Sequence, residues 1–262
     1  MKFYFAVLSI GLLLFPGCAS YRNQALRAKF AKTELRVGIE PNFQPVIFMD
    51  KGNPAGIETD IAMEFGKILG VKVVFVEMPW EKLIPSLELA DFDVIMSGMT
   101  ITEDRTKFVL FTDPYMRIGQ LAIARTEDIS EFSTKEKILA TKKKVGFLKK
   151  TTGETFVLEN CITAELKVPF DNIDDAVSAL KNKKIDLFIA DAPAIWAISD
   201  TALTPICDPL TSEKIGWAVR KNDTSLKDVL NECLDIIKDN GTLYKIESKW
   251  VPELFRDSIY ID

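Results

Sequence analysis

The stretch from Met96 to Arg105 places small and hydroxyl-bearing residues just before one arginine, an order that suits the binding of a small carboxylate. Ser97, Gly98 and Thr100 let a ligand approach the backbone closely, and hydroxyl and free N–H groups can bond it. Arg105 can then bind the carboxylate through two parallel hydrogen bonds. The stretch is therefore a candidate site for a small ligand that carries a carboxylate.

An ordinary helix start explains the same residues equally well. Thr102 can cap a helix, and Glu103 and Asp104 then lie at its positive end, where carboxylates are favourable. In that case Arg105 pairs with an acidic residue on the surface. Both interpretations stay open on this stretch alone.

The first half of the chain alternates strands and helices around this stretch. Its hydrophobic patterns predict a strand at 35–39, a helix at 59–69 that Gly70 ends, a strand at 71–77, a helix at 80–87 with Pro85 inside it, and a strand at 92–96. Strands that alternate with helices in this way favour parallel pairing, as in an α/β protein.

The second half repeats this organisation without a clear repeat in the sequence. Its patterns predict strands at 144–148 and 185–190, and helices from about Glu154, over 173–180, over 226–237 and up to about Trp250. Asp191 follows the later strand and precedes Pro193, which is typical of a helix N-cap. Two such halves leave a cleft between them, and ligands bind at the carboxyl ends of such strands.

The composition narrows the classes of function. A length of 262 residues allows one large domain or two smaller ones. The net charge of -5 argues against a nucleic-acid partner, and the absence of histidine removes Ser-His catalysis, Cys-His catalysis and histidine metal sites. Cys161, Cys207 and Cys233 allow at most one intramolecular disulfide, and no CxxC motif is present, so neither a metal site nor a cofactor is expected.

The N-terminus has the features of a bacterial export signal. Lys2 precedes the apolar run Phe3 to Phe15, which is too short to span a bilayer comfortably, so residues 1–17 are predicted to be a signal peptide. Leu14 to Cys18 resembles a lipobox, and Cys18 is predicted to be lipidated and to anchor the chain to a membrane, with plain secretion as the alternative. The polar segment 18–32 is predicted to be a tether.

The rest of the chain, from about Leu35 to Pro252, resembles the extracytoplasmic solute-binding proteins of polar amino-acid ABC transporters, known as solute-binding protein family 3. The stretches that carry the resemblance, in order, are 35–43, 56–60, 83–87, 93–105, 111–115, 145–152, 185–191 and 239–243. Any one of these stretches is weak, and their order along the chain makes the resemblance specific.

The resemblance implies an α/β, two-lobed periplasmic-binding-protein type II fold with a ligand cleft between the lobes. Residues 33–122 and 217–262 would form a discontinuous lobe I, and residues 123–216 would form lobe II. Two hinge strands, near 121–124 and 216–219, would join the lobes and let them close over one ligand. The protein would be a monomer in the cell envelope, either in the periplasm or on the outer face of the membrane, and would deliver its ligand to ABC permease subunits.

The resemblance also assigns roles to residues. Arg105, with the N–H groups of Thr100 and Thr152, would bind the α-carboxylate of a free amino acid. The α-ammonium would meet the carbonyl of Gly98, the hydroxyl of Thr100 and the carboxylate of Asp191, although Asp191 as a helix cap stays open. Ser97 and Met99 would line the same loop.

The ligand side chain would lie between Phe43 and Trp80, with its end at Glu40. An acid beside two aromatic rings suits a guanidinium or an ammonium, so we expect a basic amino acid, arginine first, with glutamine or another polar amino acid as the alternative. Lys149 and Lys150 stand where the family usually has a glycine. Positive charge at the mouth of the cleft would work against a cationic ligand, and the preferred interpretation is that both lysines are solvated.

Other classes of function remain open. Some proteins of this fold are cyclohexadienyl or arogenate dehydratases, which typically carry a Gly-Gly-Thr-Asn-Glu loop; the corresponding residues here are 150–154, and the asparagine is missing. A sensory module or a surface adhesin is a further alternative. We therefore expect a binding protein rather than an enzyme.

Overall fold

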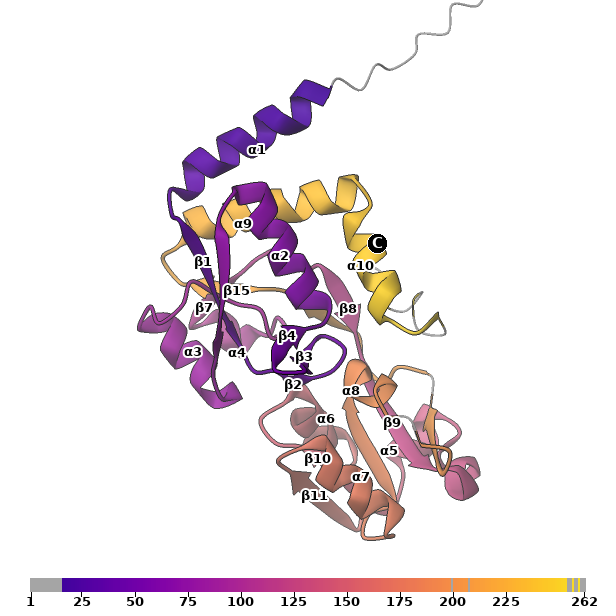
Figure 1. The fold of residues 1–262 in the computed structure, drawn as a ribbon. Helices are drawn as coiled ribbons and strands as arrows, with labels where there is room; N and C mark the ends of the chain where they lie inside the picture. Colours follow the sequence, from indigo (N-terminus) through magenta and orange to yellow (C-terminus); the bar gives the residue numbers. More distant parts are fainter. Residues whose placement is uncertain (1–15, 199, 207, 254–255, 257–258, 260–262) are drawn as a thin grey trace, which may run out of the picture.

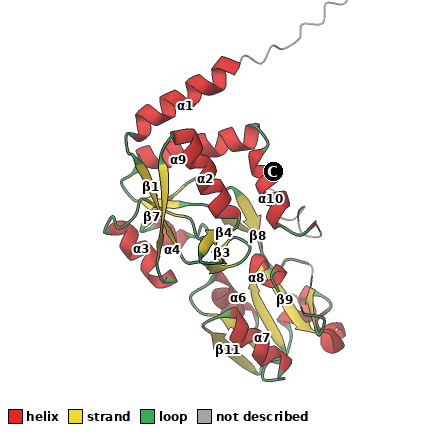
Figure 2. Cartoon of the chain, in the orientation of Figure 1, coloured by secondary structure: helices red, strands yellow, loops and turns green. Residues whose placement is uncertain are grey.

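The computed structural model describes residues 16–198, 200–206, 208–253, 256 and 259, with side chains described from Tyr21 onward. It has two α/β lobes, one above the other in Figure 1. Helices lie against the sheets of both lobes (Figure 2). The two-lobed α/β architecture predicted from the sequence is confirmed.

Lobe I is built on a sheet with the strand order β5-β1-β6-β15-β7. The bounds are β1 Glu34–Ile39, β5 Lys72–Glu77, β6 Val94–Ile95, β7 Val109–Phe111 and β15 Ala218–Arg220. Strand β1 pairs in parallel with β5 and β6, as the alternation of strands and helices predicted. The small sheet β2 Asn42–Phe43, β3 Ile47–Asp50 and β4 Asn53–Ala55 lies beside it.

The helices of lobe I are α2 Ile57–Leu69, α3 Trp80–Glu88, α4 Glu103–Thr106, α9 Thr224–Asp239 and α10 Thr242–Trp250. Buried residues at helical spacing, among them Ile61, Phe65 and Leu69, put one face of α2 into the core. Helix α2 starts at Ile57, earlier than predicted, because Gly56, with φ 121°, takes the N-cap position without any capping side chain.

Lobe II has a sheet with the order β11-β10-β12-β9-β13. The bounds are β9 Gln120–Arg125, β10 Lys144–Leu148, β11 Leu166–Phe170, β12 Leu187–Asp191 and β13 Leu203–Ile206. All of β9 is buried: Ala122 and Ala124 face one apolar cluster, and Leu121 and Ile123 face another. This alternation shows that the sheet is covered on both faces.

The cover of the lobe II sheet consists of α5 Lys135–Leu139, α6 Thr152–Asn160, α7 Ile173–Lys181, α8 Ala192–Trp196 and the 3-10 turn Thr126–Phe132. Helix α6 begins at Thr152 rather than near Glu154, because the Thr151 hydroxyl accepts the N–H of Glu154 and caps it. Cys161 is buried in this lobe and Cys233 in lobe I, so these two thiols are unpaired and far from each other; Cys207 lies outside the described residues.

Two antiparallel strands, β8 Met116–Ile118 and β14 Glu213–Ile215, connect the lobes. We call them the connecting strands. The predicted positions, 121–124 and 216–219, differ from these, because residues 120–125 pair over their whole length with the lobe II sheet and residues 218–220 pair with the lobe I sheet. The predicted lobe boundaries therefore move toward the N-terminus at both crossings.

The predicted tether over 18–32 is also wrong in the part that the structure describes with side chains. Helix α1 runs over Pro16–Phe30, and Leu26 and Phe30 are buried in the core of lobe I. The Arg27 guanidinium donates to the carbonyls of Lys67 (3.2 Å) and Ile68 (3.0 Å), which end helix α2. Leu26 and Phe30, four residues apart, lie on one face of this polar helix, and together with the Arg27 bonds they dock it on lobe I.

The predicted signal peptide lies largely in residues 1–15, outside the described residues, and the side chain of Cys18 is outside them too. Among the helices that the structure does describe, none combines the length and the apolar character needed to cross a bilayer.

The buried carboxylate of Asp93 joins three segments of lobe I. It accepts hydrogen bonds from the Arg36 N–H (3.0 Å), the Arg36 guanidinium (2.9 Å) and the Lys32 ammonium (2.8 Å), and Arg220 lies 3.7 Å away. Burial disfavours the ionised form, but the bonds from Arg36 and Lys32 outweigh it and lower the pKa of Asp93 to about 2.

We predict that Asp93→Asn lowers the free energy of unfolding by about 2 kcal/mol at neutral pH, since the hydrogen bonds from Arg36 and Lys32 to a buried carboxylate are replaced by weaker ones to a neutral amide. A carboxyl whose pKa is lowered by folding stabilises above its unfolded pKa, so the wild-type advantage should fade between about pH 4 and pH 2. Urea denaturation across this range measures it. Asp91→Asn, an exposed neighbour, is the control, and equal stabilities of the Asp93 variant and wild type at neutral pH would contradict the prediction.

Candidate functional site

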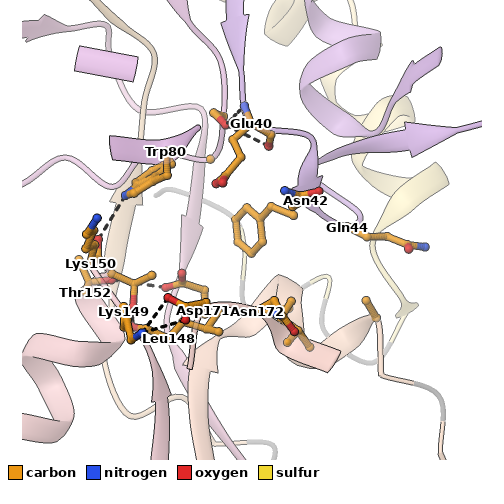
Figure 3. Close-up of a pocket in the computed structure, with 18 of the residues that line it drawn as sticks. Glu40, Asn42, Gln44, Trp80, Leu148, Lys149, Lys150, Thr152, Asp171 and Asn172 are labelled. Atoms are coloured by element: carbon orange, nitrogen blue, oxygen red, sulfur yellow. Dashed lines mark hydrogen bonds and ion pairs between the residues drawn. The ribbon is translucent and has the colours of Figure 1, made fainter. Parts of the chain in front are cut away.

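A cavity of about 840 Å³ lies between the lobes and is lined by both. Glu40 and Trp80 reach into it from lobe I, and Lys150, Thr152 and Asp171 face them from lobe II (Figure 3). All the predicted site residues except Met99 line this cavity: Glu40, Phe43, Trp80, Ser97, Gly98, Thr100, Arg105, Thr152 and Asp191.

The Met99 side chain lies in the core instead. It is only 2% exposed and belongs to an apolar cluster with Leu83, Leu87 and Phe92, beneath helix α3. The loop is not extended at Gly98, where φ is 64°, so Met99 turns into the core although Ser97, Gly98 and Thr100 line the cavity. The prediction that its side chain lines the site is wrong.

Residues Ser97–Thr100, which we call the binding loop, lead into helix α4. The Thr102 hydroxyl accepts the N–H of Arg105 (3.3 Å), so the predicted cap is confirmed. The Arg105 guanidinium turns back to donate to the Thr100 carbonyl (2.9 Å) and lies over the Trp80 ring, 5.2 Å from its centre. The two interpretations of this stretch are therefore compatible, since the capped helix orients Arg105 toward the cavity.

Asp191 occupies the N-cap position of α8 but makes no capping hydrogen bond with its side chain. Its carboxylate instead accepts from Gln120 and lies 3.4 Å from the Thr152 hydroxyl. Burial and the nearby charge of Glu213 raise the pKa of Asp191 to about 6, although Gln120 and Arg105 act in the opposite direction. The structure thus directs this carboxylate into the site rather than onto a helix end.

Gln120 and Glu213 belong to the site although sequence reasoning missed them. Gln120, fully buried at the start of β9, donates to Asp191, to the Thr152 hydroxyl (3.1 Å) and to Glu213 (3.1 Å). Glu213, on a connecting strand, also accepts from the Thr100 hydroxyl (3.2 Å). One polar network therefore links lobe II to the binding loop. The available signal was a glutamine at the end of an otherwise apolar strand.

Glu40 and Trp80 form the other end of the cavity. The Glu40 carboxylate accepts from the Trp80 backbone, and burial raises its pKa. The Trp80 indole N–H donates across the cleft to the Lys150 carbonyl (3.2 Å), as Figure 3 shows. Phe43 packs directly against Gly98, where a Cβ would lie 2.6 Å from its ring, so a larger residue there would displace the aromatic side chain.

The charges that line the cavity do not balance. The cavity is lined by six carboxylates, those of Glu40, Glu81, Asp171, Asp174, Asp191 and Asp200, and by three cations, those of Arg105, Lys149 and Lys150. The charge of Lys149 is neutralised by Asp171, because the Lys149 ammonium donates to both carboxylate oxygens of Asp171 at 2.8 Å (Figure 3). The lysine is partly exposed, as the preferred interpretation of the sequence expects, and its charge is largely cancelled at this position.

The family model described as bacterial extracellular solute-binding proteins, family 3, matches residues 35–253. Among curated proteins, a probable histidine-binding protein of Neisseria gonorrhoeae is 28% identical, covering 95% of this chain and 95% of its own. A putative ABC transporter arginine-binding protein 2 of Escherichia coli K12 is 30% identical, covering 86% of this chain and 93% of its own.

Solved structures show the same fold. A putative binding component of an ABC transporter from Wolinella succinogenes, complexed with lysine, superposes with a TM-score of 0.79 at 32% identity, covering 86% of this chain and 99% of that one. An ancestral amino acid-binding protein, described as a precursor of cyclohexadienyl dehydratase, gives a TM-score of 0.78 at 33% identity, covering 87% of this chain and 100% of that one.

We predict that Asp191→Asn stabilises the ligand-free protein. A carboxyl whose pKa is raised by folding stabilises below its unfolded pKa, and this contribution is lost as the pH rises through its folded value of about 6. The variant should exceed wild type by about 1–2 kcal/mol in free energy of unfolding at pH 8, and the difference should shrink toward zero near pH 4.

Urea denaturation at several pH values checks this prediction. The matched control is Asp171→Asn, which removes an exposed carboxylate on the rim of the same cavity and should change stability by less than about 1 kcal/mol. A destabilised Asp191 variant at pH 8 would show that the carboxylate is held for structure and not for a ligand.

Proposed function

Because the chain belongs to family 3 of the bacterial extracellular solute-binding proteins, we propose that it binds a free basic amino acid, arginine first, in the cavity between its lobes. The observation that carries this proposal is the arrangement of charge. One guanidinium, Arg105, faces the carboxylate of Asp191 within the cavity, and a second carboxylate, Glu40, lies beside the Trp80 ring.

The pose follows from these charges. The α-carboxylate of the ligand binds Arg105 and the N–H groups of Thr100 and Thr152, and the latter lies in the first turn of α6, where N–H groups favour anions. The α-ammonium binds Asp191, the Thr100 hydroxyl and the Gly98 carbonyl. Every charge of the amino-acid backbone then has a partner of opposite sign.

The cationic end of the side chain binds Glu40. Burial raises the pKa of Glu40, so an ionised Glu40 is stabilised by a cation that replaces the lost water. Phe43 and Trp80 contact the aliphatic part of the side chain and add cation–π attraction to its end. Because Arg105 already covers part of the Trp80 ring, the ligand contacts the rest of that ring.

The carboxylate of Glu40 favours arginine, lysine and histidine over glutamine as the ligand. A neutral side chain leaves Glu40 without a counter-charge in a half-buried place, which is unfavourable. The names of the relatives support this order, since they include proteins named for binding arginine and histidine and a structure complexed with lysine. A glutamine-binding protein of Bacillus subtilis is also similar, at 28% identity, so glutamine is the alternative to test.

Delivery to the permease subunits of an ABC transporter completes the proposal, since relatives are named as binding components of such transporters. We further propose that residues 1–17 direct export, that lipidated Cys18 holds the protein at the membrane, and that the protein works as a monomer in the bacterial cell envelope. In that arrangement α1, docked on lobe I, leads from the anchor directly into the fold.

An enzymatic role is not what the site supports. The relatives are solute-binding proteins, and the similar structure linked to a dehydratase is itself an amino acid-binding protein. The acid of the corresponding loop, Glu154, accepts the N–H of Lys150 (2.7 Å) and so stabilises the turn before α6. Formation of an aromatic product from prephenate would contradict this assignment.

We predict that Glu40→Gln weakens arginine binding by about 30-fold, the equivalent of about 2 kcal/mol, because a charge-assisted hydrogen bond is replaced by a neutral one. Binding of glutamine should be unchanged or improved in the same variant. Isothermal titration calorimetry with arginine, lysine, histidine and glutamine, on protein unfolded and refolded to remove any ligand retained during purification, measures these affinities.

The control for this experiment is Glu81→Gln, which removes an exposed carboxylate from the rim of the cavity, and a change of less than about three-fold is expected. Tight glutamine binding without arginine binding by the unaltered protein would overturn the assignment of a basic ligand. Equal effects of the two substitutions on arginine would show that overall negative charge, and not Glu40, selects the ligand.

A further inference from the structure

We infer that Glu58 is a positioning residue for ligand binding: it holds the N–H of Gly98 away from the cavity and ties the binding loop to both connecting strands. The inference rests on the proposed function, since it concerns how the site for the amino acid is shaped. Glu58 does not line the cavity, and it is completely buried in helix α2.

Three donors from separate segments meet the Glu58 carboxylate. The N–H of Gly98 donates to one of its oxygens (2.8 Å). The other oxygen accepts from the Tyr115 hydroxyl (2.8 Å) and from the Trp217 indole N–H (3.1 Å). The Tyr115 and Trp217 rings are stacked, 4.8 Å apart, so the two aromatic donors form one unit.

Two of these donors flank the connecting strands, and the third is in the binding loop. Tyr115 immediately precedes the connecting strand β8, and Trp217 follows the connecting strand β14. Gly98 is in the binding loop, with a φ of 64° that favours glycine. Glu58 therefore joins the loop that contacts the ligand to the lobe I ends of both segments that connect the lobes.

The chemistry of the contact explains why a carboxylate is used. An ionised carboxylate accepts on both oxygens and donates nothing, so it can serve three donors at once. Glu58 is also the second residue of α2, where the positive end of the helix favours a negative charge. Burial raises the pKa of Glu58 to about 7, against the three hydrogen bonds.

The bond to Glu58 determines how the backbone of the binding loop is oriented at Gly98. Because the Gly98 N–H is bonded inside lobe I, the Ser97–Gly98 peptide group is fixed in one orientation. This fixes the start of the turn at Gly98, with its φ of 64°, from which the Gly98 carbonyl meets the α-ammonium in the proposed pose. Without this bond the N–H could turn toward the water of the cavity, and the loop would bind the ligand less well, since ordering it again has a free-energy cost.

Glu58→Gln tests this role, because an amide has only one acceptor oxygen. The indole of Trp217 is fully buried and cannot reach water, so we expect the amide oxygen to stay with Trp217 and Tyr115 and the Gly98 N–H to lose its partner. Calorimetry with L-arginine at about pH 8.5, where Glu58 is ionised, should show binding weakened by about ten-fold or more.

Two further variants separate positioning from general stability. Tyr115→Phe removes a donor but leaves the bond to Gly98, so it should change the affinity for arginine by less than about three-fold even though it lowers stability. Adding Trp217→Phe to Glu58→Gln frees the amide oxygen to turn toward Gly98. Relative to Glu58→Gln alone, the double variant should therefore regain affinity while its stability falls further.

Several outcomes would overturn the inference. Arginine binding by Glu58→Gln equal to that of the unaltered protein would do so while leaving the proposed function intact. Affinities that fall in step with stability across all variants would assign Glu58 a purely structural role. Hydrogen exchange measured by NMR adds a test that needs no variant and no ligand: the Gly98 amide should be protected in the ligand-free protein, and fast exchange would contradict the bond.

Discussion

The opposed charges of Arg105 and Asp191 are the constraint on which the site depends. They face each other within one buried cavity, Arg105 on lobe I and Asp191 on lobe II, and burial disfavours the ionised form of both. A ligand that carries one negative and one positive group at neighbouring positions can neutralise Arg105 and Asp191 at the same time. Each lobe by itself supplies only one of these two partners. The free energy of binding then comes in part from giving these two buried charges partners of opposite sign.

The rest of the architecture holds these charges in place. Sheets covered on both faces give each lobe a rigid edge, and the groups of the site lie where strands end or helices begin. Hydrogen bonds of Gln120 and Glu213 reach from lobe II to Thr100, while Trp80 reaches Lys150 across the cleft. Closure over a ligand would therefore use contacts that link the two lobes at both ends of the cavity.

The sequence predicted well what local patterns determine. The strand Leu35 to Ile39, the cap at Thr102 and nine of the residues that line the cavity followed from periodicity, turn chemistry and resemblance. Contacts between distant segments were not predicted: Gln120 precedes the apolar run 121–124 and Glu58 precedes the helix predicted at 59–69, and no local pattern marks either residue as part of the site. The docking of α1 was missed because its buried apolar side chains are few, Leu26 and Phe30, and because the Arg27 bonds join segments distant in the sequence. Met99 was misplaced because the direction of a side chain in a loop depends on the backbone conformation.

A crystal structure of the protein with L-arginine is the decisive experiment on how the cavity binds its ligand. We expect arginine in the cavity, with its carboxylate on Arg105, its ammonium on Asp191 and its guanidinium within hydrogen-bond distance of Glu40. A neutral amino acid retained in preference to arginine, or arginine bound with its guanidinium away from Glu40, would contradict it.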